Sequence, residues 1–108
     1  MVMIVFRSRL RVDADLPALE PVGARMYELA SSMPGFISYK DFQAEDKEGL
    51  TLVEFDSAEH LRAWREHPEH VAAQEFGREK VFESYEITVC NPIRRYSFSK
   101  DKGRVESA

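Results

Sequence analysis

The chain has 108 residues, of which 44% are hydrophobic, and a formal net charge of −4. This length fits a single domain, and the apolar fraction can form a core, which argues against a disordered chain. Lysine and arginine are scattered rather than clustered, so nucleic acid is not an expected partner. The single cysteine, Cys90, leaves no disulfide to form within the chain.

The N-terminal stretch MVMIVFRSRL is not typical of a targeting segment. Its apolar run is too short, and charge follows too soon, for a secretory signal. No apolar run in the chain approaches the about 20 residues that a membrane span requires. We therefore expect a cytoplasmic protein without a membrane partner.

The first predicted strand is residues 3 to 12, where apolar and charged residues alternate. Phe6 lies on the apolar face, and the arginines lie on the other. Ser8 places a hydroxyl in the middle of the apolar face. This hydroxyl either bonds the neighbouring backbone or makes a polar contact inside a pocket, so Ser8 is a candidate pocket residue.

A helix follows, from a cap at Asp15 to about Ser32, because apolar residues recur there at helical spacing. Residues 36 to 44 are the second predicted strand. The polar, glycine-terminated stretch EDKEG predicts a hairpin loop, and residues 50 to 55 return as an antiparallel third strand. This third strand is apolar on both faces, which indicates that both faces are covered.

The second helix is predicted to be bent. Asp56 is expected to be its N-cap, in a capping box with Glu59. Proline disfavours helical backbone angles at the residue before it, so the helix is expected to break between Glu66 and Pro68.

Alternation resumes at Tyr85 and predicts a last strand, which residues 92 to 98 prolong as an edge strand. Residues 1 to 98 are expected to be one domain, and the polar residues 99 to 108 a disordered tail. The order of elements predicts an α+β, ferredoxin-like βαββαβ antiparallel sheet with both helices on one face. Two such sheets stacked through their open faces predict a homodimer.

The stretches MPGFISYKDF, LTLVEFDSAEHLRAWREHPEHVAAQ and FESYEITV resemble the antibiotic biosynthesis monooxygenase family of dimeric α/β barrels. The resemblance covers residues 2 to 92. It implies an oxygenase without a cofactor, which uses dioxygen to oxidise a small apolar, aromatic or quinol-type substrate bound between sheet and helices. Two alternatives stay open: a haem-binding or haem-degrading protein, and a non-catalytic dimer that binds a small molecule.

The haem-degrading members of the family imply a stricter set of residues. Their first-strand amide, helical tryptophan and iron-ligating histidine correspond to Ser8, Trp64 and Gln74 of this chain. Glutamine is a poor iron ligand, whereas imidazole suits iron. Haem is therefore not expected, and His67 and His70 are the two imidazoles that keep this alternative open.

The stretch AWREHPEHVAAQ supplies the catalytic candidates. On an unbroken helix, Trp64, His67 and Gln74 share a face about 80° wide. Trp64 is expected either to pack in the core with its indole N–H on a carbonyl or to line a pocket. His67 either caps a helix end or acts as a general base. Because of the bend, Trp64 and His67 are the pair that we expect to share a catalytic site.

The other candidates are assigned to substrate binding. His70 follows His67 by one turn, but two histidines lack the third ligand that a metal site needs, so no metal is expected. The predicted substrate-binding residues are Phe6, Ser8, Phe36, Tyr39, His70 and Gln74.

Overall fold

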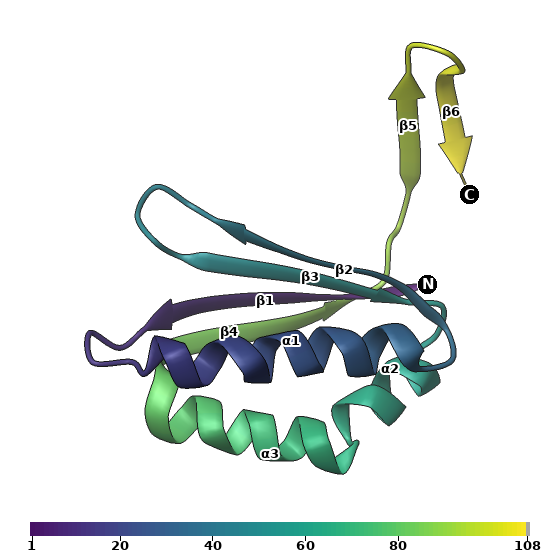
Figure 1. Cartoon of the computed structure of the whole chain (residues 1–108). Coiled ribbons are helices and arrows are strands. Elements are labelled where there is room, and N and C mark those ends of the chain that lie inside the picture. The colour runs from purple at the N-terminus through teal and green to yellow at the C-terminus, as the bar shows by residue number, and fades with distance from the viewer. Residues whose placement is uncertain (108) are drawn as a thin grey trace.

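The chain folds into a helix-covered sheet followed by a separate hairpin (Figure 1). The computed structural model describes residues 1–107. The elements in chain order are β1 (Val2–Leu10), α1 (Leu16–Ser32), β2 (Phe36–Gln43), β3 (Gly49–Phe55), α2 (Ala58–Arg65), α3 (Pro68–Phe76), the π-helical turn η1 (Gly77–Val81), β4 (Phe82–Cys90), β5 (Arg95–Ser99) and β6 (Gly103–Ser107).

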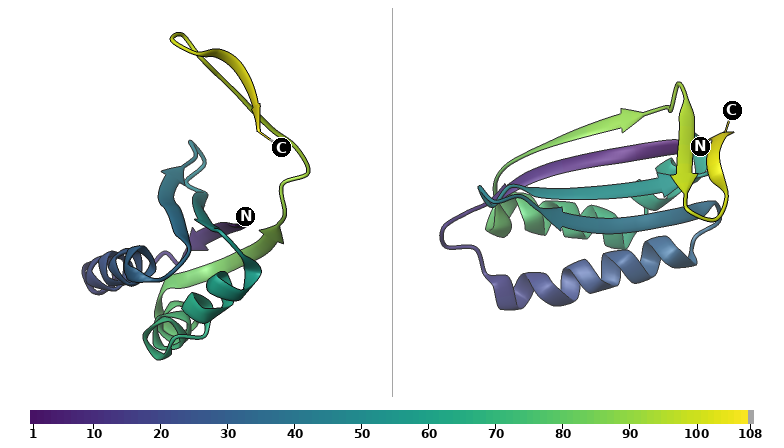
Figure 2. Two further views of the ribbon diagram at one scale, coloured as in Figure 1. Left: turned by 90° about the vertical axis from the view of Figure 1, so that its right-hand side faces the viewer. Right: turned by 90° about the horizontal axis from the view of Figure 1, so that it is seen from above.

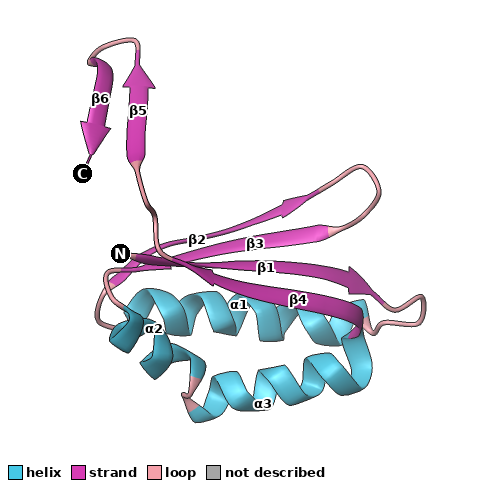
Figure 3. Ribbon diagram, turned by 180° about the vertical axis from the view of Figure 1, so that it is seen from behind, coloured by secondary structure: helices cyan, strands magenta, loops and turns pink. Residues whose placement is uncertain are grey.

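The main sheet is antiparallel, with the strand order β2-β3-β1-β4. All helices lie on one of its faces, as the front and rear views show (Figures 1 and 3). The views in Figure 2 place α1 beside α2 and α3 under the sheet. The predicted ferredoxin-like α+β fold is confirmed. Within residues 1–107, no helix has the length and apolar character to cross a membrane.

Strand register assigns the side chains to the two faces of the sheet. Ile4 pairs with Val53, and opposed residues in an antiparallel pair point to the same side. Both are buried under the helices. The other face of the sheet has no helix on it and carries apolar side chains from both central strands: Met3, Val5, Leu50 and Leu52. We call this the open face.

The core lies between the sheet and the helices. Eight buried residues form it: Val2, Ile4, Leu29, Ala30, Val53, Phe55, Leu61 and Trp64. Phe55, the last residue of β3, is fully buried and packs edge-on against Phe36, with ring centroids 5.9 Å apart. Trp64 is the only member of the core that carries a polar side-chain atom, so the core includes one indole N–H.

The N-cap of α2 differs from the sequence-based prediction. Ser57, not Asp56, caps the helix, and its hydroxyl accepts a hydrogen bond from the backbone N–H of His60. Asp56 instead contacts the ring of His60, with Oδ1 2.6 Å from Nδ1. The predicted capping box is therefore wrong by one residue, because serine and aspartate are equally good caps and sequence spacing does not choose between them.

Ser57→Ala is expected to lower the free energy of unfolding by about 1 kcal/mol, because a backbone donor of α2 loses its acceptor. Asp56→Ala is the matched control and should cost less, since Asp56 and His60 form only an exposed pair. Urea unfolding of the two variants measures the difference. A larger loss of unfolding free energy in Asp56→Ala than in Ser57→Ala would show that Asp56 is the cap.

The C-terminal region also differs from the prediction. β4 begins at Phe82 rather than Tyr85, directly after η1. β5 pairs with β6 alone and does not extend the main sheet. Disorder from residue 99 onward is wrong as far as residue 107, because Gly103, at φ 67°, allows the chain to turn back as β6. The expected domain boundary at residue 98 falls inside β5.

Candidate functional site

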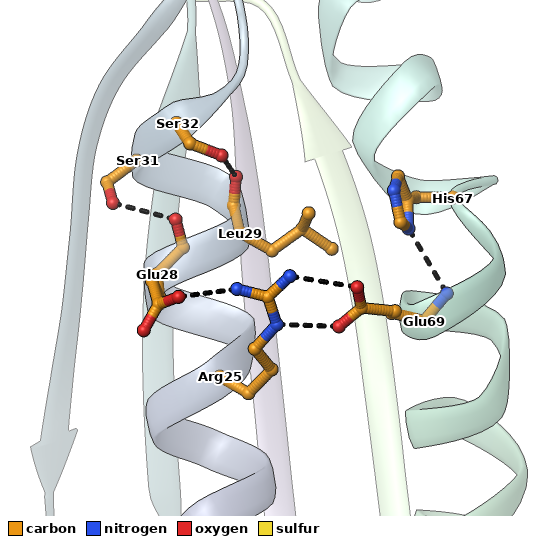
Figure 4. A network of polar contacts seen from close by, with 7 residues as sticks. All are labelled: Arg25, Glu28, Leu29, Ser31, Ser32, His67 and Glu69. Atoms are coloured by element: carbon orange, nitrogen blue, oxygen red, sulfur yellow. Dashed lines mark hydrogen bonds and ion pairs between the residues drawn. The ribbon is translucent and has the colours of Figure 1, made fainter.

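The bend in the second helical segment lies where the sequence predicts it. α2 ends at Arg65, and α3 begins at Pro68. His67 is the N-cap of α3, and its Nδ1 accepts a hydrogen bond from the backbone N–H of Glu69 at 3.1 Å (Figure 4). Of its two predicted roles, His67 has the capping role, which engages Nδ1 with backbone.

An ion pair joins the start of α3 to α1. Arg25 donates to both carboxylate oxygens of Glu69, at 2.6 and 2.8 Å, and also to Glu28 (Figure 4). The hydrogen bonds from Arg25 lower the pKa of Glu69 below its usual value. This exposed clamp holds the two helices together beside His67, and it leaves the interior of the helix–sheet interface to Trp64 and its neighbours.

Trp64 is the central residue of the candidate site. Its side chain is 4% exposed. Its ring centroid lies 5.8 Å from that of Phe55, 6.3 Å from that of Tyr39 and 4.3 Å from that of His70. Trp64 therefore joins the core of the sheet to α3.

The indole N–H of Trp64 has no partner. Among the residues that the structure describes, Nε1 of Trp64 is the one buried side-chain nitrogen or oxygen without a hydrogen bond. The expected bond to a carbonyl is thus not made. A buried donor without an acceptor costs about 1–3 kcal/mol, and such groups are rare in folded proteins. Trp64 therefore carries a buried donor that no described residue satisfies.

His70 contacts Trp64 directly, with the two rings inclined at 68°. Burial, with the nearby charges of Arg65 and His67, lowers the pKa of His70 from 6.5 to about 4. Its Nδ1 lies 2.7 Å from Nε2 of Gln74. Its own Nε2 makes no hydrogen bond to the described residues and is not one of their fully buried unpartnered atoms, so it is at least partly exposed.

The lowered pKa of His70 predicts how stability depends on pH. The unfolded chain takes up a proton on this histidine near pH 6.5, whereas the folded chain does so only near pH 4. Stability is therefore expected to fall as the pH drops from 6.5 to 4. NMR titration of the His70 ring measures the midpoint, and His70→Phe should remove this part of the pH dependence. A midpoint near 6.5 would contradict the burial.

Tyr39 completes the group on the sheet side. It lies on β2, opposite Val53 of β3, and faces the helices. Burial, followed by the charge of Asp41, raises the pKa of Tyr39 to about 12, so its hydroxyl keeps its proton at neutral pH. We refer to Tyr39, Trp64, His70 and Gln74 together as the Trp64 cluster.

The other predicted binding residues lie around this cluster at different distances along the sheet. Phe36 of β2 and Phe6 of β1 pack against the core on the helix-covered face of the sheet. Phe6 also contacts Phe82 and Tyr85, each at 5.5 Å between ring centroids. Ser8 lies further along β1, paired with Gly49 and Tyr85. The structure therefore brings four of the predicted residues together, packs the two phenylalanines against the same core, and separates Ser8 and His67 from them.

Two surface cavities lie elsewhere. One, of about 280 Å³, lies over β1 and β4 and is lined by Arg7, Ser8, Arg9, Glu48, Ser84, Tyr85 and Glu86. The other, of about 380 Å³, lies between the turn after β1 and the end of α3, with a mostly charged lining: Arg11, Asp13, Asp15, Phe76, Glu79 and Lys80. The Trp64 cluster lines neither cavity. Residues 1–107 also hold no group of three or more histidine, cysteine or acidic side chains arranged for a metal ion.

Comparison with known proteins identifies the family. The family model described as antibiotic biosynthesis monooxygenase matches residues 1–75. The chain belongs to this family. The matched region includes the whole Trp64 cluster. A protein of Bacillus subtilis (strain 168), described as the uncharacterized protein YqjZ, is 36% identical over 77 residues, which are 71% of this chain and 68% of that protein.

Solved structures agree with the fold. Rv0793 from Mycobacterium tuberculosis superposes with a TM-score of 0.77 at 23% identity, over 89% of this chain and 98% of that one. SnoaB from Streptomyces nogalater, a cofactor-independent oxygenase, gives 0.69 at 19% identity, over 84% and 91%. A dimeric ferredoxin-like protein of unknown function from Thermobifida fusca gives 0.67 at 16% identity, over 84% and 90%. At these identities the likeness shows the fold alone.

Proposed function

We propose that this chain is a cofactor-independent oxygenase that oxidises a small aromatic or quinol-type molecule with dioxygen. Family membership and the similar fold of SnoaB, itself a cofactor-independent oxygenase, support the class of reaction. The observation that carries the proposal is the unpartnered indole N–H of Trp64 beside the imidazole of His70. Together they offer hydrogen bonds to an oxygen of an otherwise apolar substrate.

The reaction needs no external reductant. The substrate binds as the anion that it forms by losing a proton to solvent, because the Trp64 cluster holds no group that takes up this proton at neutral pH. The anion gives electrons to dioxygen, and the resulting carbon–oxygen bond forms on the substrate itself. For an anthrone, the methylene carbon loses two hydrogens and becomes a carbonyl, one oxygen atom enters the product, and the other leaves as water. The protein has to bind the anion, stabilise the charge on its oxygen and exclude water.

The roles follow from position. His70 polarises the substrate oxygen through its accessible Nε2, Trp64 donates its indole N–H, and Tyr39 offers a protonated hydroxyl. Phe6 and Phe36 form apolar walls on the sheet side. We assign the catalytic role to His70 rather than to His67, because Nδ1 of His67 is used in capping α3.

Haem is a poor fit to the same residues. The side chain at the expected ligand position, Gln74, donates one hydrogen bond to the carbonyl of Arg65 and a second to His70. Its amide is thus committed within the protein. A shift of the Soret band when haemin is added to the full chain would contradict this poor fit.

A binding protein without turnover is the second candidate. The Trp64 cluster holds no group that readily takes a proton at neutral pH, because the pKa of His70 is about 4 and that of Tyr39 about 12. A site of this kind can bind an anion or a quinone without reacting. Oxygen uptake separates the candidates, since a binding protein would retain its ligand and consume no dioxygen.

We also propose that the chain forms a homodimer through its open face. Four half-buried apolar side chains occupy this face, and Phe42 next to them is 44% exposed. The dimeric ferredoxin-like protein from Thermobifida fusca has a similar fold. Stacking two open faces would remove this apolar surface from water.

A further inference from the structure

The orientation of the Gln74 amide is fixed by its neighbours. Nε2 of Gln74 lies 3.2 Å from the carbonyl oxygen of Arg65. A carbonyl only accepts, so the amide NH₂ and not the amide oxygen must lie at this position. The second hydrogen of the same NH₂ group then points to Nδ1 of His70, 2.7 Å away.

This arrangement also fixes the proton on His70. Because Nδ1 accepts from Gln74, it carries no hydrogen, and the single proton of the neutral imidazole resides on Nε2. Nε2 is the accessible ring nitrogen. The nitrogen that a ligand reaches is consequently a hydrogen-bond donor.

The local fold explains why Gln74 holds this position. His70 and Gln74 are four residues apart on α3, so their side chains meet on one face of the helix. Arg65 ends α2, where the last carbonyls lack helical partners. Gln74 supplies a donor to one of these carbonyls across the bend, and this anchor sets the direction of its amide.

We propose that Gln74 is a positioning residue that makes His70 a hydrogen-bond donor, so that the site takes ligands presenting an acceptor oxygen, either a quinone carbonyl or a phenolate. Naming the ligand class rests on the proposed function, whereas the state of His70 does not. Trp64 adds a second donor, and the two together select an apolar ring system with acceptor oxygens over one that offers only donors.

The first test measures His70 in the full chain without ligand. Long-range ¹H–¹⁵N NMR at pH 8 is expected to show a pyridine-like Nδ1 and a pyrrole-like Nε2. In Gln74→Glu the carboxylate can only accept, so the proton should move to Nδ1. Gln43→Glu makes the same change on an exposed strand residue and should leave His70 unaltered. A proton on Nδ1 in the unsubstituted protein, or an unchanged ring in a folded Gln74→Glu, overturns the proposal.

The second test uses menadione, a naphthoquinone with two carbonyl acceptors, against 2-methylnaphthalene, which has none. Menadione is expected to shift the Nε2–H signal of His70 and to bind about tenfold more weakly to Gln74→Glu, the loss of about one hydrogen bond. Equal binding of the two probes, or no menadione binding, contradicts the ligand class. Neither test measures turnover, so a chain that passes both and consumes no oxygen refutes only the proposed oxygenase.

Discussion

His70→Ala is expected to lower the rate of oxygen uptake by about 10²–10³-fold, the usual effect of removing one donor to a developing oxyanion. His70 contacts Trp64, and its accessible Nε2 is the donor that the substrate oxygen would meet. The pKa of about 4 keeps its imidazole neutral, so the rate should not follow a histidine titration between about pH 5 and 8.

His67→Asn is the matched comparison for this prediction. Asparagine keeps an acceptor at the N-cap of α3, so the helix should stay capped while the imidazole is lost. We expect only a small change in rate. If His67→Asn loses more activity than His70→Ala, His67 is the catalytic residue, as the sequence predicts, and the assignment to His70 is wrong.

Leu52→Asp is expected to convert a dimer into a monomer of 12.5 kDa. Leu52 lies on the open face, in register with Val5 of β1. Burying a leucine is worth about 1.5–3 kcal/mol, and a symmetric interface loses it twice, so the dimer dissociation constant should rise by at least about 10²-fold. Analytical ultracentrifugation at micromolar concentration measures the change.

The control for Leu52→Asp is Ala24→Asp, which adds the same charge at an exposed position of α1 on the helix side of the sheet. This variant should sediment like the unsubstituted protein. A monomeric unsubstituted chain, or a Leu52→Asp variant that stays dimeric, would remove the open face as the interface.

Much of the fold could be predicted because its signals are local. Alternation in β1 separates Ile4 and Phe6 from Arg7, and the register confirms the two faces. Pro68 breaks the second helix because its ring restricts the preceding residue, whatever the tertiary contacts. These features depend on a few neighbouring residues, which a sequence displays directly.

The candidate site was predicted less well because its residues lie on both sides of the bend between α2 and α3. Trp64 and His67 are one turn apart in sequence, but the chain leaves the helical path between them and turns His67 to the N-cap of α3. His70 and Gln74 both follow the bend, so their four-residue spacing holds, and it could have indicated their pairing. The contact between Trp64 and His70 depends on how far α3 rotates, which spacing alone does not determine.

The C-terminal hairpin could not be predicted from amino-acid composition. Residues 99 to 107 are mostly polar, yet they form part of β5, a turn and β6. Arg94 bonds Glu106 at 2.7 Å, and the guanidinium groups of Arg94 and Arg104 lie over the ring of Tyr96. The pairs with Glu106 and Arg104 connect the two arms of the hairpin, and such polar pairs leave no apolar periodicity in the sequence.

Oxygen uptake by the 108-residue chain tests the central claim most directly. The protein would be treated with a chelator and offered a panel of anthrones and naphthoquinols in an electrode, with ¹⁸O₂ used to follow the product. We predict uptake above the buffer rate, one labelled oxygen atom in each quinone formed from an anthrone, and loss of both signals in His70→Ala. Uptake no faster than in buffer for every member of the panel, or a rate that His70→Ala leaves unchanged, would contradict the account.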